Sequence, residues 1–407
     1  MILTVHAVRR VMGLAWVAAS IVCAAQTGSS AQNQDWLVGP FTRPVKAPVI
    51  RPRAESTFKD PISGKVVHWE ALHTFNPAAI VKDDKIDVLY RAEDDTGAMV
   101  IGEHTSRLGL AESGDGIHFK RLPEPVFYPD HDSQQENEVP GGVEDPRIVE
   151  REDGVYVLTY TQWARTRGVY SVGIATSKDL RTWTKHGKAF GSSGKYGELK
   201  YKSAAIVTHR VGDRLVAAKI KGKYWMYWGE IQIRLATSTD LIHWTPVEDA
   251  SGRPVELLKD RAGRFDSAFP ESGPPPLLTR DGIVVIYNAK NKDENAKNKD
   301  TNAKNKDTNA KNKDANAEHG GGDAALAPGT YSVGEALFDA EDPTRLKARV
   351  EEPVFRPEEA FERSGQYAAG TTFAEGLVLF QRKLFLYYGC ADSFVGVATA
   401  PEPKGLE

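Results

Sequence analysis

The sequence contains few residues that could crosslink the chain or bind a metal. Its 407 residues include only two cysteines, four methionines and ten histidines. Cys23 lies in an N-terminal segment that resembles a secretory signal, so the mature chain would keep Cys390 alone and could form no internal disulfide. Its stability must then come from a packed core, which a chain of this length can supply.

Long hydrophobic runs are also missing, apart from one near the N-terminus. Arg9 and Arg10 precede an apolar stretch at 11–25, which is too short to cross a membrane. A basic start, an apolar core and a small residue at the cleavage site are the parts of a secretory signal. We therefore expect residues 1–31 to be a signal peptide and the protein to be secreted or periplasmic.

The mature chain has no basic tract. The formal net charge is −3, and removal of residues 1–31, which carry two arginines and no acidic residue, would make it −5. Such a mildly acidic protein is a poor partner for nucleic acid or an anionic membrane. We expect a single domain at 32–407 that uses no cofactor.

Helical periodicity is scarce, and one short strand-like phrase occurs five times. Each copy is rich in small and β-branched residues around an alanine, and three copies continue into an acidic turn and an aromatic residue. The copies begin at Leu108, Val172, Ile233, Val333 and Val395, and their alanines are 64, 61, 100 and 62 residues apart. A fixed period of strand-rich units predicts an all-β fold, specifically a five-bladed β-propeller. An ordinary β-sandwich is the alternative.

Each unit offers further strands before this phrase. Segments rich in Val, Ile, Tyr and Trp lie at 86–90, 156–161, 224–228, 283–287 and 384–388. A shorter strand precedes each of them. In a propeller this first strand lines the central channel, so side chains at its end should converge on one axis.

The longest interval between alanines contains an insertion. The sequence Ala-Lys-Asn-Lys-Asp-Xaa-Asn occurs four times between Ala289 and Asn316, and alanine is its one apolar position. This pattern is far short of a coiled-coil seam. So polar a tract cannot bury enough surface to offset its ordering entropy. We expect a disordered low-complexity insertion at 289–322, within the fourth blade and near the substrate mouth.

Polar residues at equivalent positions of the repeat should gather at one end of the channel. The first strands supply Asn76, Glu144, Asp145, Lys202, Glu271 and Thr371, and the ends of the second strands supply Arg91, Arg165, Glu230, Asn288 and Asp392. Histidine is nearly absent from this set and no cysteine pair occurs, which argues against a metal site and against a Cys or Ser nucleophile. Paired carboxylates with aromatic neighbours suit glycosyl chemistry.

Four motifs in this frame resemble those of glycoside hydrolase family 130. They are Gly141-Gly142-Val143-Glu144-Asp145-Pro146-Arg147-Ile148, Tyr90-Arg91-Ala92-Glu93-Asp94, His104-Thr105-Ser106-Arg107 and Gly389-Cys390-Ala391-Asp392. The resemblance covers the chain from about Phe75 to Ala398. It implies a five-bladed propeller that acts on β-mannosides, either as a phosphorylase or as a hydrolase.

The resemblance also implies that Asp145 is the general acid and delivers its proton through the mannose 3-hydroxyl. We expect the neighbouring Glu144 and partial burial to raise the pKa of Asp145, which is the direction that the role requires. The alternative is that Asp145 only caps the turn before Pro146.

Two glutamates bear on the choice between water and phosphate as nucleophile. Glu230 and Glu271 resemble residues that replace phosphate contacts in the β-1,2-mannosidase members, and two carboxylates would repel the anion. Asn288 stands where the phosphorylases tend to carry histidine. Arginines and Lys202 remain available for phosphate, although they can equally bind sugar hydroxyls or hold the carboxylates. A salt-bridged loop for Glu230 and a solvated turn for Glu271 are the alternatives.

We therefore predict a secreted inverting β-mannosidase, acting on β-1,2 linkages, with Asp145 as acid and Glu230 or Glu271 as base. The predicted substrate-binding residues are Asn76, Arg91, Arg107, Trp163, Arg165, Lys202 and Asp392. Trp163 could stack on a sugar ring, whereas Trp183 and Trp244 occupy equivalent positions of two blades and are expected to pack between blades. Two other hypotheses remain: a phosphorylase that releases α-mannose 1-phosphate, and a non-catalytic propeller that binds mannosides.

Overall fold

The computed structural model describes residues 35–293 and 321–406, and contacts divide the chain into Met1–Asp35 and Trp36–Glu407. The expected signal peptide at 1–31 and residues 294–320 of the expected insertion lie outside the described residues. No helix in the described part of the chain is long and apolar enough to cross a membrane. The described fold is all-β, with one short α-helix, α1 (Gln135–Glu138).

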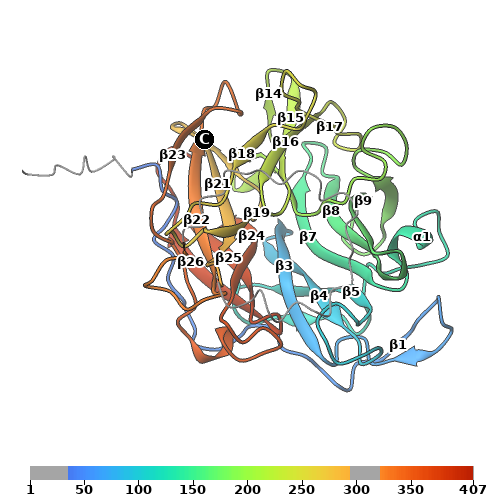
Figure 1. Ribbon diagram of the computed structural model, residues 1–407. Coiled ribbons are helices and arrows are strands. Elements are labelled where there is room, and N and C mark those ends of the chain that lie inside the picture. The colour runs from blue at the N-terminus through green and yellow to red at the C-terminus, as the bar shows by residue number, and fades with distance from the viewer. Residues whose placement is uncertain (1–34, 294–320, 407) are drawn as a thin grey trace, which may run out of the picture. The chain divides into compact units, whose positions relative to one another are not determined.

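The described strands form sheets of two, fifteen, six and three strands, and within these sheets five groups of mainly antiparallel strands follow one another along the chain (Figure 1). After a small hairpin of β1 (Phe58–Lys59) and β2 (Val66–Val67), the groups are β3 (His73–Lys82), β4 (Lys85–Glu93), β5 (Ser106–Ser113) and β6 (Lys120–Arg121); β7 (Gly142–Glu150), β8 (Tyr156–Ala164), β9 (Val169–Ser177) and β10 (Thr184–Lys188); β11 (Ala204–Ile206), β12 (Thr208–Val211), β13 (Arg214–Ala217), β14 (Lys219–Ile220), β15 (Lys223–Trp228), β16 (Ile233–Ser238), β17 (Thr245–Pro246) and β18 (Glu256–Leu258); β19 (Ala268–Ser272), β20 (Leu277–Thr279), β21 (Gly282–Lys290), β22 (Tyr331–Phe338) and β23 (Leu346–Arg349); and β24 (Thr372–Phe380), β25 (Lys383–Cys390) and β26 (Phe394–Pro401). Parallel pairs link β5 to β7, β7 to β13 and β12 to β20. The strands predicted before each repeated phrase are confirmed as β4, β8, β15, β21 and β25, and the phrases themselves form β5, β9, β16, β22 and β26.

The glycine of the repeated phrase lies directly opposite a tyrosine of the preceding strand. The four pairs are Tyr90 with Gly109, Tyr160 with Gly173, Tyr287 with Gly334 and Tyr388 with Gly396. A β-carbon on Gly173 would lie 2.5 Å from the Tyr160 ring, so only glycine leaves room for it. The glycine of the repeated phrase is therefore required by its packing against a tyrosine, and four of the five groups share this contact.

Each of these tyrosines donates its hydroxyl hydrogen to a fully buried carboxylate. The acceptors are Glu70 for Tyr90, Glu138 for Tyr160, Asp266 for Tyr287 and Glu362 for Tyr388. A cation pairs with every one of these carboxylates: Arg121, Lys185, Arg349 and Arg43, respectively. Pairing and hydrogen bonding are what make a buried carboxylate tolerable in a core.

The acidic turn of the repeated phrase is held by hydrogen bonds between residues close in sequence. In the third copy, Ser238 Oγ donates to Asp240, and Asp240 accepts the backbone N–H groups of Ile242 and His243. The indole of Trp244 then donates to the backbone carbonyl of Leu241. The second copy repeats these contacts around Asp179, which explains why serine, aspartate and the aromatic residue recur together.

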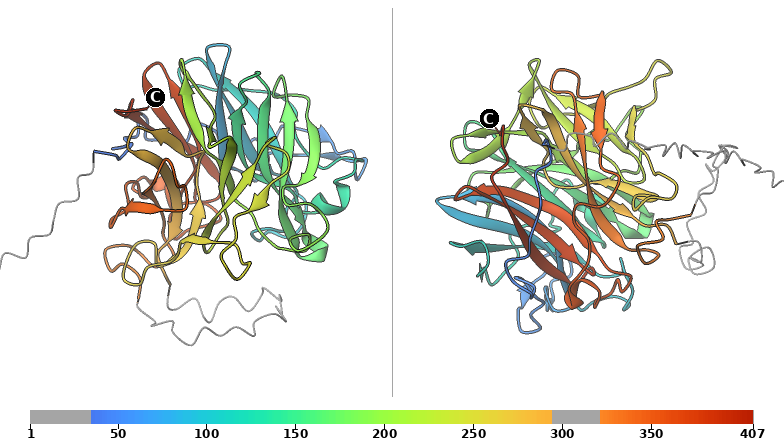
Figure 2. Two further views of the ribbon diagram at one scale, coloured as in Figure 1. Left: turned by 90° about the horizontal axis from the view of Figure 1, so that it is seen from above. Right: turned by 90° about the vertical axis from the view of Figure 1, so that its left-hand side faces the viewer.

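Buried apolar clusters join each group to its neighbours. Four clusters lie between successive groups along the chain, and the fifth joins the last group to the first, through residues such as Tyr387 and Val88. Figure 2 shows the final strands, in red, beside β3, in blue. The N-terminal segment also bridges to β26, with Thr42 paired to Thr399 and Ile50 to Val395. Segments from both ends of the described chain therefore build the fifth group.

Candidate active site

Bulges in the first strands of the groups turn polar side chains toward one cavity. The register of β3 shifts at Asn76 and that of β7 shifts at Asp145, where φ is 45° and 46° respectively. β24 has a matching shift at Glu375. A non-glycine residue at positive φ is strained, and bulges commonly re-aim a side chain beside an active site. The strain at Asn76 and Asp145 thus coincides with the predicted acid and its neighbour.

The cavity has a volume of about 460 Å³, which is the size of a small-ligand site. Its lining residues are Phe75, Asn76, Arg91, Ile101, Gly102, Glu144, Asp145, Thr161, Trp163, Tyr170, Lys202, Glu230, Glu271, Tyr331, Tyr367, Thr371, Phe373 and Asp392. Eight of the ten predicted site residues are in this set. All five strand groups contribute to it, so segments that are distant in the sequence meet at this cavity.

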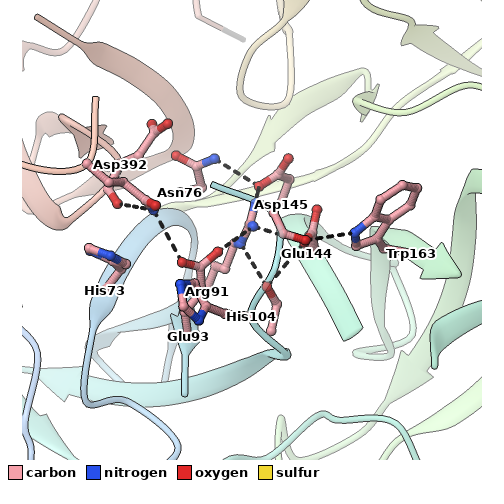
Figure 3. Close-up of polar contacts among 12 residues, drawn as sticks. His73, Asn76, Arg91, Glu93, His104, Glu144, Asp145, Trp163 and Asp392 are labelled. Atoms are coloured by element: carbon pink, nitrogen blue, oxygen red, sulfur yellow. Dashed lines mark hydrogen bonds and ion pairs between the residues drawn. The ribbon is translucent and has the colours of Figure 1, made fainter. Parts of the chain in front are cut away.

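Arg91 organises one side of the cavity (Figure 3). Its guanidinium donates to Asp145 at 3.0 Å, to Glu144 at 2.9 Å and to Glu93 at 2.7 Å. Asn76 donates a further hydrogen bond to the same Asp145 oxygen, at 2.8 Å. Three carboxylates therefore surround one arginine, and the carboxyl group of Asp145 is held from two sides.

Lys202 organises the opposite side. Its ammonium lies 3.2 Å from Glu271, 3.7 Å from Glu230 and 3.7 Å from Asp145. Ser203 Oγ also donates to the Glu271 carboxylate. The predicted acid and both candidate bases thus share a single cation, although they come from different strand groups.

The protonation of the acidic pair differs from the sequence expectation. Burial alone would raise the pKa of Asp145, but Arg91, Lys202 and the hydrogen bond from Asn76 outweigh burial and hold that pKa below its ordinary value. Burial raises the pKa of Glu144 to about 7, against the opposing effect of Arg91 and with reinforcement from Asp145. The expected rise at Asp145 is therefore wrong, because the sequence did not reveal that two cations, Arg91 and Lys202, lie beside this side chain. Of the two carboxyl groups, Glu144 has the raised pKa and Asp145 the lowered one.

Asp392 is a further acid of the cavity with a displaced pKa. Burial raises its pKa to about 7, opposed by Arg91 and assisted by Asp145. A carboxyl group that is protonated near neutral pH can donate a hydrogen bond to a sugar hydroxyl as well as accept one.

Three residues assigned to the site from sequence do not line the cavity. Arg107 is buried and donates to Asp94 at 2.7 Å and to Asp60 at 3.0 Å, so its charge is paired inside the protein. Arg165 donates weakly to the backbone carbonyls of Gly102 and His104. Asn288 exchanges two hydrogen bonds with the backbone of Ala374 and thereby joins β21 to β24. The first two are corrections to the predicted substrate-binding set.

The aromatic lining is richer than the sequence indicated. Trp163 does line the cavity, and Trp244 is buried between strand groups as expected. Tyr331, Tyr367 and Phe373 form a second aromatic wall that sequence reasoning missed; the rings of Tyr331 and Tyr367 are 5.5 Å apart. One available signal was that Tyr331 begins the strand of the fourth repeated phrase, the first strand after the insertion.

Histidine also lies closer to the site than expected. The rings of His73 and His104 are 6.3 Å apart near Arg91 (Figure 3), and His73 Nδ1 is 2.9 Å from Ser393 Oγ. Burial lowers the pKa of His73, with Glu93 opposing it. Neither histidine is among the residues that line the cavity.

Comparison with known proteins gives one consistent result. The sequence profile of a family described as beta-1,4-mannooligosaccharide phosphorylase matches residues 48–300 and 318–406. A 1,2-beta-oligomannan phosphorylase from Thermoanaerobacter sp. (strain X514) is 31% identical over 353 residues, which is 86% of this chain and 94% of that protein.

Two solved structures are more similar in sequence. One comes from work reporting that this family of mannoside phosphorylases contains hydrolases that target β-1,2-mannosidic linkages in Candida mannan; it is 46% identical, with a TM-score of 0.82, and covers 92% of this chain and 97% of that one. A glycosyl hydrolase from Bacteroides ovatus is also 46% identical, with a TM-score of 0.81 and coverage of 92% and 98%. The chain belongs to glycoside hydrolase family 130.

Proposed function

We propose that the protein hydrolyses β-1,2-mannosides with inversion. The observation that carries this proposal is the neutralisation of the two cations among the described cavity-lining residues. Arg91 faces three carboxylates and Lys202 faces three, with Asp145 common to both. Phosphate would have to bind beside Lys202, whose ammonium already pairs with Glu230 and Glu271. The negative charges of these two glutamates would repel the anion.

In the proposed mechanism, Asp145 protonates the leaving group through the 3-hydroxyl of the mannosyl unit. Burial raises the pKa of Glu144 to about 7 while that of Asp145 is held low, so Glu144 supplies the proton: Glu144 gives it to Asp145, and Asp145 passes it to the 3-hydroxyl as that hydroxyl gives its own proton to the leaving oxygen. Glu271 or Glu230 activates water on the opposite face of the sugar. Asn76, Arg91 and Asp392 hold the mannosyl hydroxyls, and Trp163 packs against the ring.

The comparisons support hydrolysis by degree of similarity. The solved structure from the work on β-1,2-mannan hydrolases shares 46% identity with this chain, whereas the oligomannan phosphorylase shares 31%. Phosphorolysis is the second candidate, because curated relatives in the comparison are phosphorylases of β-1,2-mannosides. It would release α-mannose 1-phosphate.

We further propose that the five strand groups are the blades of a five-bladed propeller and that residues 1–31 direct the protein out of the cytoplasm. Five apolar clusters that link each group to the next, including the last to the first, support the propeller. So does the pairing of the N-terminal segment with β26. The basic start and short apolar run of the N-terminal sequence support export.

One assay separates hydrolysis from phosphorolysis. Purified protein is incubated with β-1,2-mannobiose with and without inorganic phosphate, and the first product is followed by proton NMR. We expect α-mannose at a rate independent of phosphate. A strict requirement for phosphate would establish the phosphorylase, and initial release of β-mannose would contradict inversion.

A further inference from the structure

Three consecutive apolar side chains project into solvent beside the cavity. Met99, Val100 and Ile101, in the loop between β4 and β5, are 65%, 57% and 54% exposed. Single exposed apolar residues are ordinary on a protein surface, but a contiguous run next to a ligand cavity indicates a contact surface. Ile101 and Gly102 already line the cavity that contains Asp145.

The loop holds this run in a defined position. Asp94 accepts the backbone N–H groups of Thr96 and Thr105 at the two ends of the loop. The two ends of the loop approach each other so closely that a β-carbon on Gly97 would lie 2.2 Å from the carbonyl oxygen of Glu103. The Gly102 carbonyl accepts from the indole of Trp163. The exposed run is therefore fixed at the rim by contacts with the elements that form the acid side of the cavity.

The stereochemistry of the reaction predicts which part of the substrate lies against Met99, Val100 and Ile101. In an inverting displacement, the nucleophile and the leaving group occupy opposite faces of the sugar. Glu230 follows β15 and Glu271 lies on β19, whereas the loop joins β4, which carries Arg91, to β5, which pairs with β7. The candidate bases and the loop therefore come from different strand groups around the cavity, and a leaving group opposite the bases would face the loop.

We propose that Val100 and Ile101 form the contact surface for the leaving-group sugar, by packing against the C–H groups of its pyranose ring. This inference rests on the proposed function only in taking a β-mannoside as substrate, since the same stereochemistry holds for attack by water and by phosphate. The loop would thus select the acceptor-side unit, while the polar cavity selects the mannosyl unit that is transferred.

The test compares two substrates that differ only in the leaving group. β-1,2-Mannobiose has a leaving-group sugar and β-mannosyl fluoride has none. For Ile101→Ser, kcat/KM for the disaccharide should fall about tenfold, the scale of a lost apolar contact, while kcat/KM for the fluoride should stay unchanged. Val100→Ser should have a smaller effect of the same kind. Val66→Ser, at a residue that is 67% exposed in β2, is the matched control.

Each other outcome has a definite meaning. Equal losses on both substrates, or no loss on the disaccharide, would overturn the assignment. A wild-type dimer that Val100→Ser dissociates would also overturn it, because a second copy would then cover the run. If the protein turns over neither substrate, the proposed function fails instead, and calorimetry on Asp145→Asn decides the inference: Ile101→Ser in that background must weaken binding of mannobiose and leave binding of mannose unchanged.

Discussion

Glu271 and Glu230 reach the same ammonium, but their surroundings differ. Glu271 is 2% exposed, accepts a hydrogen bond from Ser203, and has its pKa raised by burial against the effect of Lys202. Glu230 lies at the edge of the cavity, partly exposed, at 3.7 Å from Lys202. A general base needs a fixed position and a raised proton affinity. In the proposed hydrolysis, these contacts favour Glu271 as the base and leave Glu230 to hold the attacking water or Lys202.

We therefore expect Glu271→Gln to lower kcat by about 10²- to 10⁴-fold, the range for loss of a general base. Glu230→Gln should lower kcat less, because it leaves the base in place. Initial rates on β-1,2-mannobiose at one pH measure both. Glu256→Gln, at a partly exposed surface glutamate paired with Lys259, is the control. A greater loss in Glu230→Gln than in Glu271→Gln would reverse the assignment.

The sequence predicted which residues meet in the cavity better than it predicted their charge states. Repeat-equivalent positions identified Asp145, Lys202 and Glu271, because a repeat converts sequence position into a place around an axis. It could not identify the direction of the Asp145 pKa shift, which depends on distances of about 3 to 4 Å to Arg91 and Lys202. Arg107 was misassigned because its partner Asp60 lies 47 residues away, outside every repeated segment.

At the scale of strands, Arg147 ties the acid segment to the base segment. It is 2% exposed and donates to the carbonyl of Asp145 on β7 and to the carbonyls of Ser272 and Gly273, directly after Glu271. Its remaining partner is the buried carboxylate of Glu375, at 2.9 Å. One planar guanidinium thus fixes the backbone of two strands that carry catalytic candidates.

Replacing Arg147 by lysine keeps the positive charge but removes the planar set of N–H donors that the guanidinium provides. We expect Arg147→Lys to lower kcat by about 10²-fold, because small displacements of reacting groups have effects of that size, with a smaller change in KM. Arg349→Lys is the matched control, since Arg349 also pairs with a buried carboxylate and donates to a carbonyl, but in β23. Equal losses of kcat in the two variants would mean that Arg147 is only structural.

The repeated glycine belongs to the same scale, because it is set by the strand beside it. Gly173→Ala would place a β-carbon 2.5 Å from the Tyr160 ring, and overpacking of this kind costs roughly 1 to 3 kcal/mol. Gly114→Ala meets no atom within 4 Å and should change the free energy of unfolding by less than about 0.5 kcal/mol. Urea unfolding of both variants checks this. Equal stability would show that the strand pair adjusts without cost.

Across the whole molecule, the repeat predicted the strand order and the positions of the long strands, since alternating apolar residues and turn residues are local signals. The buried tyrosine and carboxylate pairs were not foreseen. Each acid, such as Glu138 or Glu362, lies outside the repeated phrase and reaches its tyrosine only through folding. A similar physical reason explains the missed aromatic wall, where Tyr331 and Tyr367 come from a strand and a separate loop.

One buried carboxylate stands outside these networks and makes stability depend on pH. Glu335, on β22, is fully buried, and its one hydrogen bond among the described residues comes from the backbone N–H of Val38. Burial raises its pKa to about 7, with that hydrogen bond opposing the rise. The folded state therefore keeps this proton to higher pH than the unfolded chain, in which glutamate titrates near its ordinary value.

The contribution of Glu335 to stability is complete below the unfolded pKa and is lost as the pH rises through about 7. Over that interval the loss approaches about 3 kcal/mol, at 1.36 kcal/mol per pKa unit. Glu335→Gln cannot titrate and keeps an oxygen for Val38, so its free energy of unfolding relative to wild type should rise by about that amount between about pH 4.5 and pH 7.5. Urea titrations at the two pH values measure the difference, and Glu256→Gln should show none. Parallel pH profiles for wild type and Glu335→Gln would mean that the buried carboxyl group keeps an ordinary pKa, through water that reaches it beside Val38.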